Sequence, residues 1–443
     1  MALEKILITE EEKNNMLPCK TYIISFLIIT KILENYINYR QVLRLRENRL
    51  IPKELISLGL DQSKYEANQK YSLAKTKFKM YSTLFKDFFV LIFLYFNIYP
   101  LQYEISKKLC IKLNPENEYG PLIWFVILEI ISEEMASLPC DVYETFFLEQ
   151  KFGFNKSSIK TFIIDQIKTV FLFILFIPIL VCLLVYIIIK CGEYFYIVAE
   201  IVSIFCLFLF MWIFPNFIQP LFNKFKELEN HELYKSIINL AKRVNFPLKK
   251  IYEMDQSERS SHSNAYLFGF WKNKRIVLYD TLIKHLNKKE IEAVLSHELG
   301  HWAKWHSTVI LFLAFTNFFI IFYLAKFFIE ETAIFVSFGF EQKSIFIGLF
   351  LFFLSYYPVT FYIEIGQNFI VRNIEYQADK YSYDLGYGDL LITSLIKMSD
   401  FNKSDLDPDC LYSIVNDSHP TLIQRVRALN EYKNKDKDKE KMN

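Results

Sequence analysis

Glycine and paired cysteines are scarce in this chain, and both absences narrow the possible functions. The 443 residues include only 11 glycines, which argues against a Gly-rich phosphate-binding fold and against a barrel of tight turns. The seven cysteines are scattered, with no Cys-x-x-Cys pair, so a thiolate zinc site or a redox motif is not expected. The formal net charge is only +2, and nothing in it indicates nucleic acid as a partner.

Long apolar stretches are abundant instead. Apolar residues make up 52% of the chain and aromatic residues 17%, which favours a membrane bundle over a set of soluble domains. A membrane-spanning helix needs ~20 mostly apolar residues, so the lipid bilayer is an expected partner. Seven segments predict spans: about 22–38, 83–100, 121–137, 167–189, 194–214, 307–328 and 345–363.

Two of these predicted spans carry ionisable residues. The segment 22–38 contains Lys31 and Glu34, and 121–137 contains three glutamates. Such groups are costly in a bilayer unless they face water or one another. The pattern therefore indicates a water-filled interior, with amphipathic soluble helices as the alternative for these two segments.

Basic residues predict the orientation of the bundle. The loop 39–81 carries ten Lys or Arg, whereas 329–342 carries none. Because cytosolic loops are enriched in basic residues, we expect 39–81 to be cytosolic. Alternation of the spans then places 138–166, 215–306 and the region after about 366 on the same side, and the N-terminus in the lumen.

The chain divides into membrane and catalytic segments. We expect five N-terminal helices over 1–214, a catalytic segment over 215–306, a helix hairpin over 307–368, a second catalytic segment over 369–430 and a disordered charged tail over 431–443. Within the first catalytic segment the patterns predict a helix over 231–244, strands over 249–254, 264–270 and 275–280, and a turn at 271–274 that joins the last two strands as a hairpin.

The motif HELGH at 297–301 predicts a zinc site. Asn287 can cap a helix from Lys288 to about His306, with Glu290 completing a capping box. His297 and His301 then lie one turn apart on one face, as two ligands of one ion must. Glu298 lies about 100° around the helix, where it reaches a water rather than the ion. The apolar flanks favour this site over a solvated polar patch, and His306 would be a poor ligand because it is out of line.

Glu375 is the best candidate for the third ligand. The helix hairpin returns the chain to the side where His301 left it, and Glu375 follows directly. Asp379, one turn later, can accept a hydrogen bond from a ligand histidine. Arg372 is expected beside them as a further partner of the site. An ordinary surface helix with an Arg372–Glu375 pair is the alternative.

These residues predict peptide hydrolysis. Zinc polarises the scissile carbonyl, and Glu298 takes a proton from water and delivers it to the leaving amine. The oxyanion needs a further donor, for which His419 and Arg425 in SHPTLIQRV are available. The strand 264–270 could pair with an extended substrate backbone.

Several motifs in order resemble the CaaX prenyl protease 1 family, the Ste24-type membrane zinc proteases, over most of the chain. They are YINYRQ (36–41), LPCDVYETFFLEQKFGFN (138–155), FPNFIQPLFNKF (214–225), SNAYLFGF (263–270), EIEAVLSHELGHWAKWH (290–306), EYQAD (375–379) and SHP (418–420).

The resemblance implies a fold and a substrate. The fold would be mostly α, with seven membrane helices around a large chamber and a small α+β zinc-protease domain at its cytosolic end. The substrate would be a prenylated CaaX protein that loses its last three residues, and some members also cut near the N-terminus of such a substrate. The implied site comprises one Zn²⁺ on His297, His301 and Glu375, the catalytic Glu298, the transition-state stabiliser His419, and Asn264, Ala265 and Tyr266 for substrate pairing.

The C-terminal residues suggest a location. KEKMN (439–443) resembles the KxKxx retrieval signal of the endoplasmic reticulum, so we expect that membrane, with the nuclear envelope as a second location; a plain charged tail is the alternative. Two other functions remain open. One is a quality-control metalloprotease without a prenyl requirement, and the other is a non-catalytic scaffold. The 138–155 motif argues against the first, and an intact Glu298 argues against the second.

Overall fold

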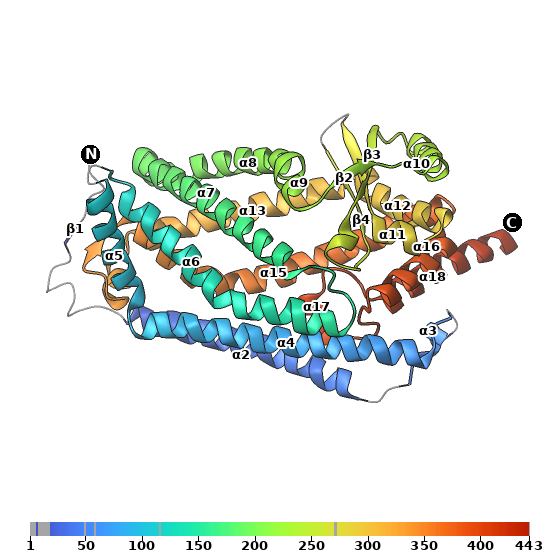
Figure 1. The fold of residues 1–443 in the computed structure, drawn as a ribbon, viewed down its shortest axis with the longest axis horizontal. Helices are drawn as coiled ribbons and strands as arrows, with labels where there is room; N and C mark the ends of the chain where they lie inside the picture. The colour runs from blue at the N-terminus through green and yellow to red at the C-terminus, as the bar shows by residue number, and fades with distance from the viewer. Residues whose placement is uncertain are drawn as a thin grey trace.

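The computed structural model describes residues 6–7, 18–47, 50–56, 59–114, 117–269 and 273–442. Long helices run along most of an elongated molecule, and a small sheet with shorter helices forms the end that carries the C-terminus (Figure 1). The protein is thus mostly α with one α+β end, as predicted.

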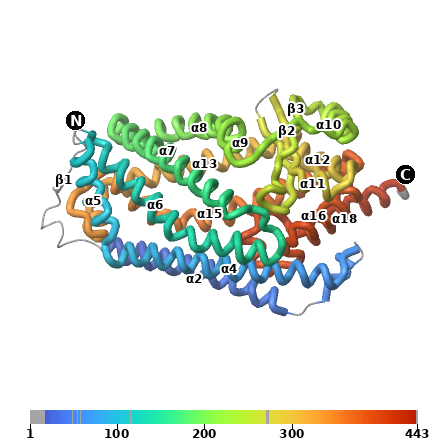
Figure 2. Tube along the Cα trace, in the orientation of Figure 1, coloured from blue at the N-terminus to red at the C-terminus, as the bar shows by residue number. Residues whose placement is uncertain are grey.

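The N-terminal half consists of long helices, and α2 packs along α4 (Figure 2). A π-helical segment, Glu144–Glu149, extends α6, and another, Phe214–Ile218, joins α8 to α9. The helices are α2 (Cys19–Arg46), α3 (Lys53–Ile56), α4 (Gln62–Tyr95), α5 (Ile98–Leu113), α6 (Gly120–Tyr143), α7 (Ile159–Cys191), α8 (Phe195–Ile213) and α9 (Gln219–Phe222).

Among the described residues, three helical stretches are long and apolar enough to cross a membrane, or four if the bent pair α4 and α5 counts as one span. The three are 159–222, His306–Ile329 and Ile345–Asp384. The predicted spans 22–38 and 121–137 are helical, within α2 and α6, but are not among them. Length and composition therefore support membrane insertion without confirming seven spans.

The predicted span 83–100 is wrong as a continuous helix. Helix α4 ends at Tyr95, and α5 starts at Ile98 after a bend of 74°. Asn97 lies between them in the left-handed region, with φ of 52°, a conformation in which a right-handed helix cannot continue. The hydropathy is continuous here, so only the backbone reveals the break.

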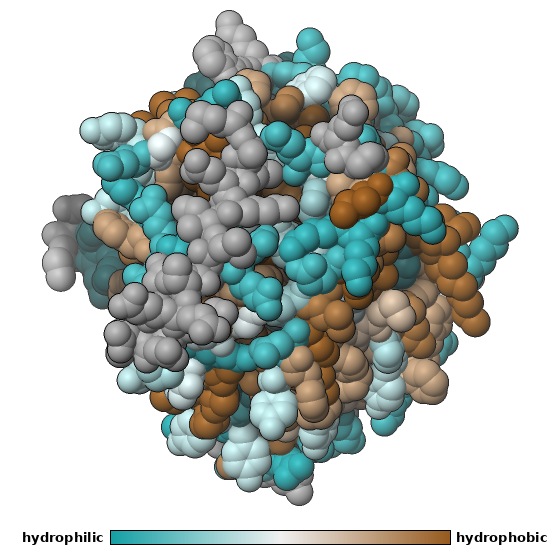
Figure 3. Space-filling view, turned by 90° about the vertical axis from the view of Figure 1, so that its left-hand side faces the viewer, coloured by the Kyte–Doolittle hydropathy of each residue, from teal (hydrophilic) through white to brown (hydrophobic). Residues whose placement is uncertain are grey.

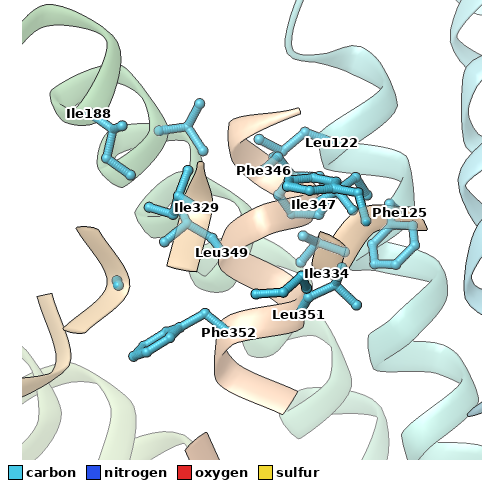
Figure 4. Packing of buried hydrophobic residues seen from close by; sticks show 14 of the residues in the cluster. Leu122, Phe125, Ile188, Ile329, Ile334, Phe346, Ile347, Leu349, Leu351 and Phe352 are labelled. Atoms are coloured by element: carbon cyan, nitrogen blue, oxygen red, sulfur yellow. The ribbon is translucent and has the colours of Figure 1, made fainter. Parts of the chain in front are cut away.

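A hydrophobic core holds the membrane helices together at the end away from the sheet. Ile347 and Leu351 of α15 (Ile345–Asp384) are fully buried in one cluster with Phe125 of α6 and Ile188 of α7 (Figure 4). The surface of this end carries hydrophilic and hydrophobic residues side by side (Figure 3). Helix α15 has 40 residues and so spans ~60 Å, from this core to the catalytic end.

The sheet has the order β2-β3-β5-β4, with a parallel pair between β3 and β5 and antiparallel pairs elsewhere. The predicted hairpin of 264–270 and 275–280 is confirmed, although part of its turn lies outside the described residues. Among the described residues, strand β4 pairs with β5 alone, so its other edge is free of them. The strands are β2 (Phe225–Glu227), β3 (Leu248–Met254), β4 (Ala265–Phe268) and β5 (Lys274–Tyr279); β1 (Ile6–Leu7) pairs separately with β6 (Gln342–Lys343).

The described residues of the C-terminal half form nine further α-helices. The boundaries predicted at 368 and 430 fall inside the continuous helices α15 and α18, because neither proline nor a left-handed residue occurs at either point. The helices are α10 (His231–Arg243), α11 (Asp280–His285), α12 (Lys288–Ala303), α13 (His306–Ile329), α14 (Thr332–Ser337), α15 (Ile345–Asp384), α16 (Gly388–Phe401), α17 (Cys410–Asn416) and α18 (Leu422–Met442).

The prediction of a disordered tail over 431–443 is wrong for residues 431–442, which continue α18. Lys433 Nζ lies 2.7 Å from Asp389 Oδ1, and the Tyr383 hydroxyl donates to Asp436 over 2.9 Å. These contacts attach the charged helix to the catalytic end, and its lysines are good helix formers.

Ion pairs join the basic segment 39–81 to the catalytic end. Arg40 pairs with Asp409 at 2.9 Å, and Arg44 pairs with Asp407 at 2.6 Å. The segment 138–166 reaches the same end through a bridge between Asn155 and Ser260. The segments predicted to share one side of the membrane therefore lie together in the fold.

Candidate active site

Helix α12 carries the HELGH motif and begins as predicted. The Asn287 side chain accepts from the Glu290 backbone N–H over 3.0 Å, and the Glu290 carboxylate accepts from the Asn287 N–H over 2.9 Å. The helix ends at Ala303, before the predicted His306, because Trp305 has a φ of 58°. This left-handed residue interrupts the right-handed helix, and His306 starts α13.

Gly300 allows α15 to approach α12 closely. A Cβ atom at this position would lie 3.1 Å from both Cα and O of Ala378, closer than van der Waals packing permits. Next to this contact, the hydroxyls of Ser296 and Ser382 are 2.5 Å apart. The glycine of HELGH therefore positions Glu375, which precedes Ala378 on α15 by almost one turn.

His297, His301 and Glu375 form a cluster that can hold a metal ion. The Nε2 atoms of the two histidines are 3.2 Å apart, and the Glu375 carboxylate lies 3.5 Å from His297 and 3.3 Å from His301. The donor atoms all lie within 4.8 Å of one another. Glu375 Oε2 is buried without a hydrogen-bond donor, which is costly unless a cation is its partner.

Asp379 and Arg425 orient His297 from behind. Nδ1 of His297 lies 2.9 Å from Asp379 Oδ1, and Arg425 donates twice to the same carboxylate, over 2.6 and 2.8 Å. Burial and Arg425 lower the pKa of His297, but the bonds to Asp379 and Glu375 prevail and raise it to about 9. The contact between Nδ1 and Asp379 directs Nε2 into the cluster, where a bound metal ion would take the place of the Nε2 proton.

His306 performs the equivalent role for His301, and the sequence analysis missed it. Their Nδ1 atoms are 3.1 Å apart, and Nε2 of His306 lies 3.4 Å from Gln377 Oε1. Since Gln377 Oε1 only accepts, His306 donates to it through Nε2 and accepts from His301 through Nδ1. This tautomer leaves Nε2 of His301 unprotonated. The helix break at Trp305 allows this contact between His301 and His306, which helical spacing alone could not predict.

Arg372 does not lie among the partners of the cluster, so that prediction is wrong. Its guanidinium donates to the Ser413 carbonyl and to Gln424 Oε1, each over 2.9 Å. It joins α15 to α17 and α18. The buried Arg425, 9% exposed, takes the position beside the carboxylates.

Glu298 and His419 flank the cluster. Burial raises the pKa of the Glu298 carboxyl, although the charges of His297 and His301 lower it. His419 Nε2 lies 3.4 Å from Glu375 Oε1, and its side chain is 62% exposed. Ser418 Oγ is 2.9 Å from Nδ1 of His419. An accessible imidazole thus lies beside Glu375, and Glu298 is close enough for its carboxyl to interact with the charges of both histidines.

Strand β4 lies next to this region, since α12 packs against it. The Asn264 carbonyl accepts from the Tyr279 N–H of β5. Because backbone groups alternate along an antiparallel strand, Ala265 points its N–H and C=O to the free edge. The Asn264 side chain accepts from that N–H over 2.8 Å, and the Tyr266 hydroxyl accepts from Gln219 over 2.5 Å. Of the three predicted residues, Ala265 therefore offers backbone groups to the unpaired edge, and Asn264 and Tyr266 flank it.

Comparison with known proteins identifies the family. Residues 41–224 match the CAAX prenyl protease N-terminal family, described as five membrane helices, and 227–433 match peptidase family M48. The CAAX prenyl protease 1 homolog of Arabidopsis thaliana is 37% identical over 93% of this chain and 98% of its own length. CAAX prenyl protease 1 of Saccharomyces cerevisiae is 34% identical over 95% and 97%, and the human homolog 31% over 89% and 92%.

A solved structure has the same fold. The crystal structure of S. mikatae Ste24p matches with a TM-score of 0.88 and 35% identity, over 93% of this chain and 99% of that one. The two family models together cover the N-terminal helices from residue 41 and the segments that carry the cluster. The chain therefore belongs to the CAAX prenyl protease 1 family of M48 peptidases, and it is a multi-pass membrane metalloendopeptidase.

Proposed function

We propose that the protein removes the last three residues from prenylated CaaX proteins in a zinc-dependent reaction. The observation that carries this proposal is the buried His297–His301–Glu375 cluster beside a free strand edge, in a chain whose relatives are named CAAX prenyl proteases.

Zinc fits the donor set of this cluster. Two nitrogens bound tetrahedrally to zinc at ~2.0 Å lie ~3.3 Å apart, and the two Nε2 atoms are 3.2 Å apart. Two imidazoles and one carboxylate, with room for one further ligand, are typical of a catalytic zinc. We infer one Zn²⁺ per chain. When bound, it supplies Lewis acidity to the scissile carbonyl and to the attacking water.

The surrounding residues divide the remaining chemistry. Glu298 accepts a proton from the attacking water and hands it to the leaving amine. His419, exposed beside Glu375, donates a hydrogen bond to the oxyanion. Arg425 was predicted to bind substrate, but it is buried against Asp379, and we propose that it orients His297 instead.

Strand addition at β4 positions the substrate. An extended peptide pairs with the outward backbone groups of Ala265, displacing the Asn264 side chain from the Ala265 N–H. The pairing requires no particular side chain on the peptide. Specificity must therefore come from both ends of the substrate, the prenyl group and the carboxyl terminus.

The membrane arrangement is part of the proposal. We infer seven membrane helices around a chamber, in the endoplasmic reticulum and the nuclear envelope, with the catalytic end in the cytosol. The ten basic residues of 39–81 and their contacts with the catalytic end support this orientation. Lys31, Glu34 and Asp87 form an ion-pair cluster between α2 and α4, as expected for helices beside a hydrated interior.

The decisive experiment compares farnesylated and unmodified CaaX peptides, with and without a zinc chelator, on the purified full-length protein in detergent. We expect cleavage of the farnesylated peptide only, lost with chelator and restored by zinc. Equal cleavage of both peptides would instead establish a protease without a prenyl requirement. Lack of any metal-dependent cleavage would contradict the enzymatic proposal altogether.

A further inference from the structure

A cavity opens beside the metal cluster, on the side of His419. It encloses about 650 Å³ and extends from His419 and Arg425 to Lys75 and Lys79 on α4. This volume lies within the range of small-ligand sites. The cavity is therefore large enough to receive the peptide that leaves after cleavage.

Strand geometry directs the carboxyl end of the substrate into this cavity. A substrate antiparallel to β4 runs toward Asn264 and then Ser263 at its C-terminal end. Asn402 exchanges two hydrogen bonds with the Ser263 backbone, over 3.0 and 3.3 Å, and Asn402 also lines the cavity. The residues after the scissile bond thus leave the strand edge where the cavity begins.

Lys79 is the cation in this cavity that is most available to a ligand. Arg425 is held by Asp379, and Lys75 lies 3.8 Å from Glu149. The Lys79 ammonium contacts an amide oxygen, Asn416 Oδ1, at 3.1 Å. Its charge lowers the pKa of the nearby Asp417 carboxyl, but the described part of the chain places no carboxylate in an ion pair with it.

Two carboxylates also line the cavity, but burial reduces their charge. Asp405 accepts hydrogen bonds from the Gln41 side chain and the Asp407 N–H, and burial raises its pKa to about 7. Burial also raises the pKa of Asp417. The two carboxylates therefore repel an incoming anion less strongly than two fully charged carboxylates would.

A leaving peptide of three residues is long enough to reach toward Lys79. Three extended residues reach ~10 Å beyond the scissile bond. Asn416, which holds Lys79, is three residues before His419, and three residues of chain span at most ~11 Å. We propose that Lys79 binds the C-terminal carboxylate of the substrate, an inference that rests on the proposed CaaX cleavage. An anion fixed there selects free C-termini and sets the cut three residues away.

The test uses two farnesylated peptides that differ only at the C-terminus, one with a free carboxylate and one with an amide. We expect the wild-type protein to prefer the acid about fivefold in kcat/KM, mainly through KM, as for a partly exposed charge pair. In Lys79→Met, kcat/KM for the acid peptide should fall to the value for the amide peptide, while kcat/KM for the amide peptide stays unchanged. Lys79→Arg should retain the preference.

Lys77→Met is the matched control, because Lys77 lies on the same helix and does not line the cavity; it should keep the wild-type preference. The Kd values of the acid and amide peptides, measured without turnover on Glu298→Ala, should show the same preference for the acid peptide. Equal cleavage of acid and amide by the wild type, or an acid preference that survives in Lys79→Met, would overturn the inference alone. Failure of the wild type to cleave either peptide would overturn the proposed function as well.

Discussion

Gly300→Ala is expected to weaken zinc binding without touching a ligand. The added Cβ would lie 3.1 Å from Cα and O of Ala378 and 3.2 Å from Cβ of Tyr381. Two of these atoms are backbone, so no side-chain rotation relieves the contact. Ordinary contact starts near 3.4 Å, and α12 and α15 must therefore separate by a few tenths of an ångström.

That separation acts directly on the metal cluster. Glu375 lies on α15, three residues before Ala378, whereas His297 and His301 lie on α12. Metal–ligand distances tolerate only ~0.2 Å. Overpacking costs ~1–3 kcal/mol, and if a similar strain falls on the ligand set, zinc affinity should drop ~10–100-fold, as when outer-shell support is lost.

The assay is zinc titration against a competing chelator, together with thermal unfolding in detergent. Gly366→Ala is the matched control on α15, because its Cβ would meet nothing within 4 Å. It should bind zinc normally and be as stable as the wild type or more so, since alanine favours a helix by up to ~1 kcal/mol. Wild-type zinc affinity and activity in Gly300→Ala would refute the reasoning.

Three further predictions concern individual carboxylates. Glu298→Ala should retain one zinc per chain in metal analysis and lose peptide hydrolysis; normal cleavage would show that Glu298 is not the base. Glu375→Ala should bind less than one zinc per chain, and unchanged occupancy would remove it from the ligand set. Because the pKa of Asp405 is raised to about 7 in the folded protein, its contribution to stability is fully present below ~pH 4 and is lost as pH rises through 7. The unfolding midpoint should therefore change less with pH between 4 and 8 in Asp405→Asn than in the wild type. An equal pH dependence in the two proteins would contradict this.

Local spacing predicted those parts of the site that lie within one helix. His297 and His301 are one turn apart, and the capping box at Asn287 begins their helix. Glu375 followed from the helix hairpin, which returns the chain to the same side. The strands β3, β4 and β5 also appeared as predicted, because their apolar patterns and turn residues are local signals.

The predictions that were wrong share one physical cause: single backbone residues and long-range contacts leave no periodic signal in the sequence. Asn97 and Trp305 both adopt positive φ. Asn97 interrupts the helix within a continuous apolar run, and the helix break at Trp305 allows His306 to contact His301. Arg372, near Glu375 in sequence, was predicted beside the ligands, and Arg425 was predicted to bind substrate. Arg425 instead reaches Asp379 from α18, 46 residues away.

The charges of the site explain why both Asp379 and Arg425 are buried there. With neutral imidazoles, Glu298, Glu375 and Asp379 carry three negative charges and Arg425 carries one positive charge. The net formal charge of these groups is therefore minus two, which one Zn²⁺ would neutralise. Without Arg425, Asp379 would be a buried anion that repels Glu375; without Asp379, the guanidinium would face His297 and the cation. The pair therefore supplies the acceptor that His297 needs while leaving the cluster matched to a divalent ion.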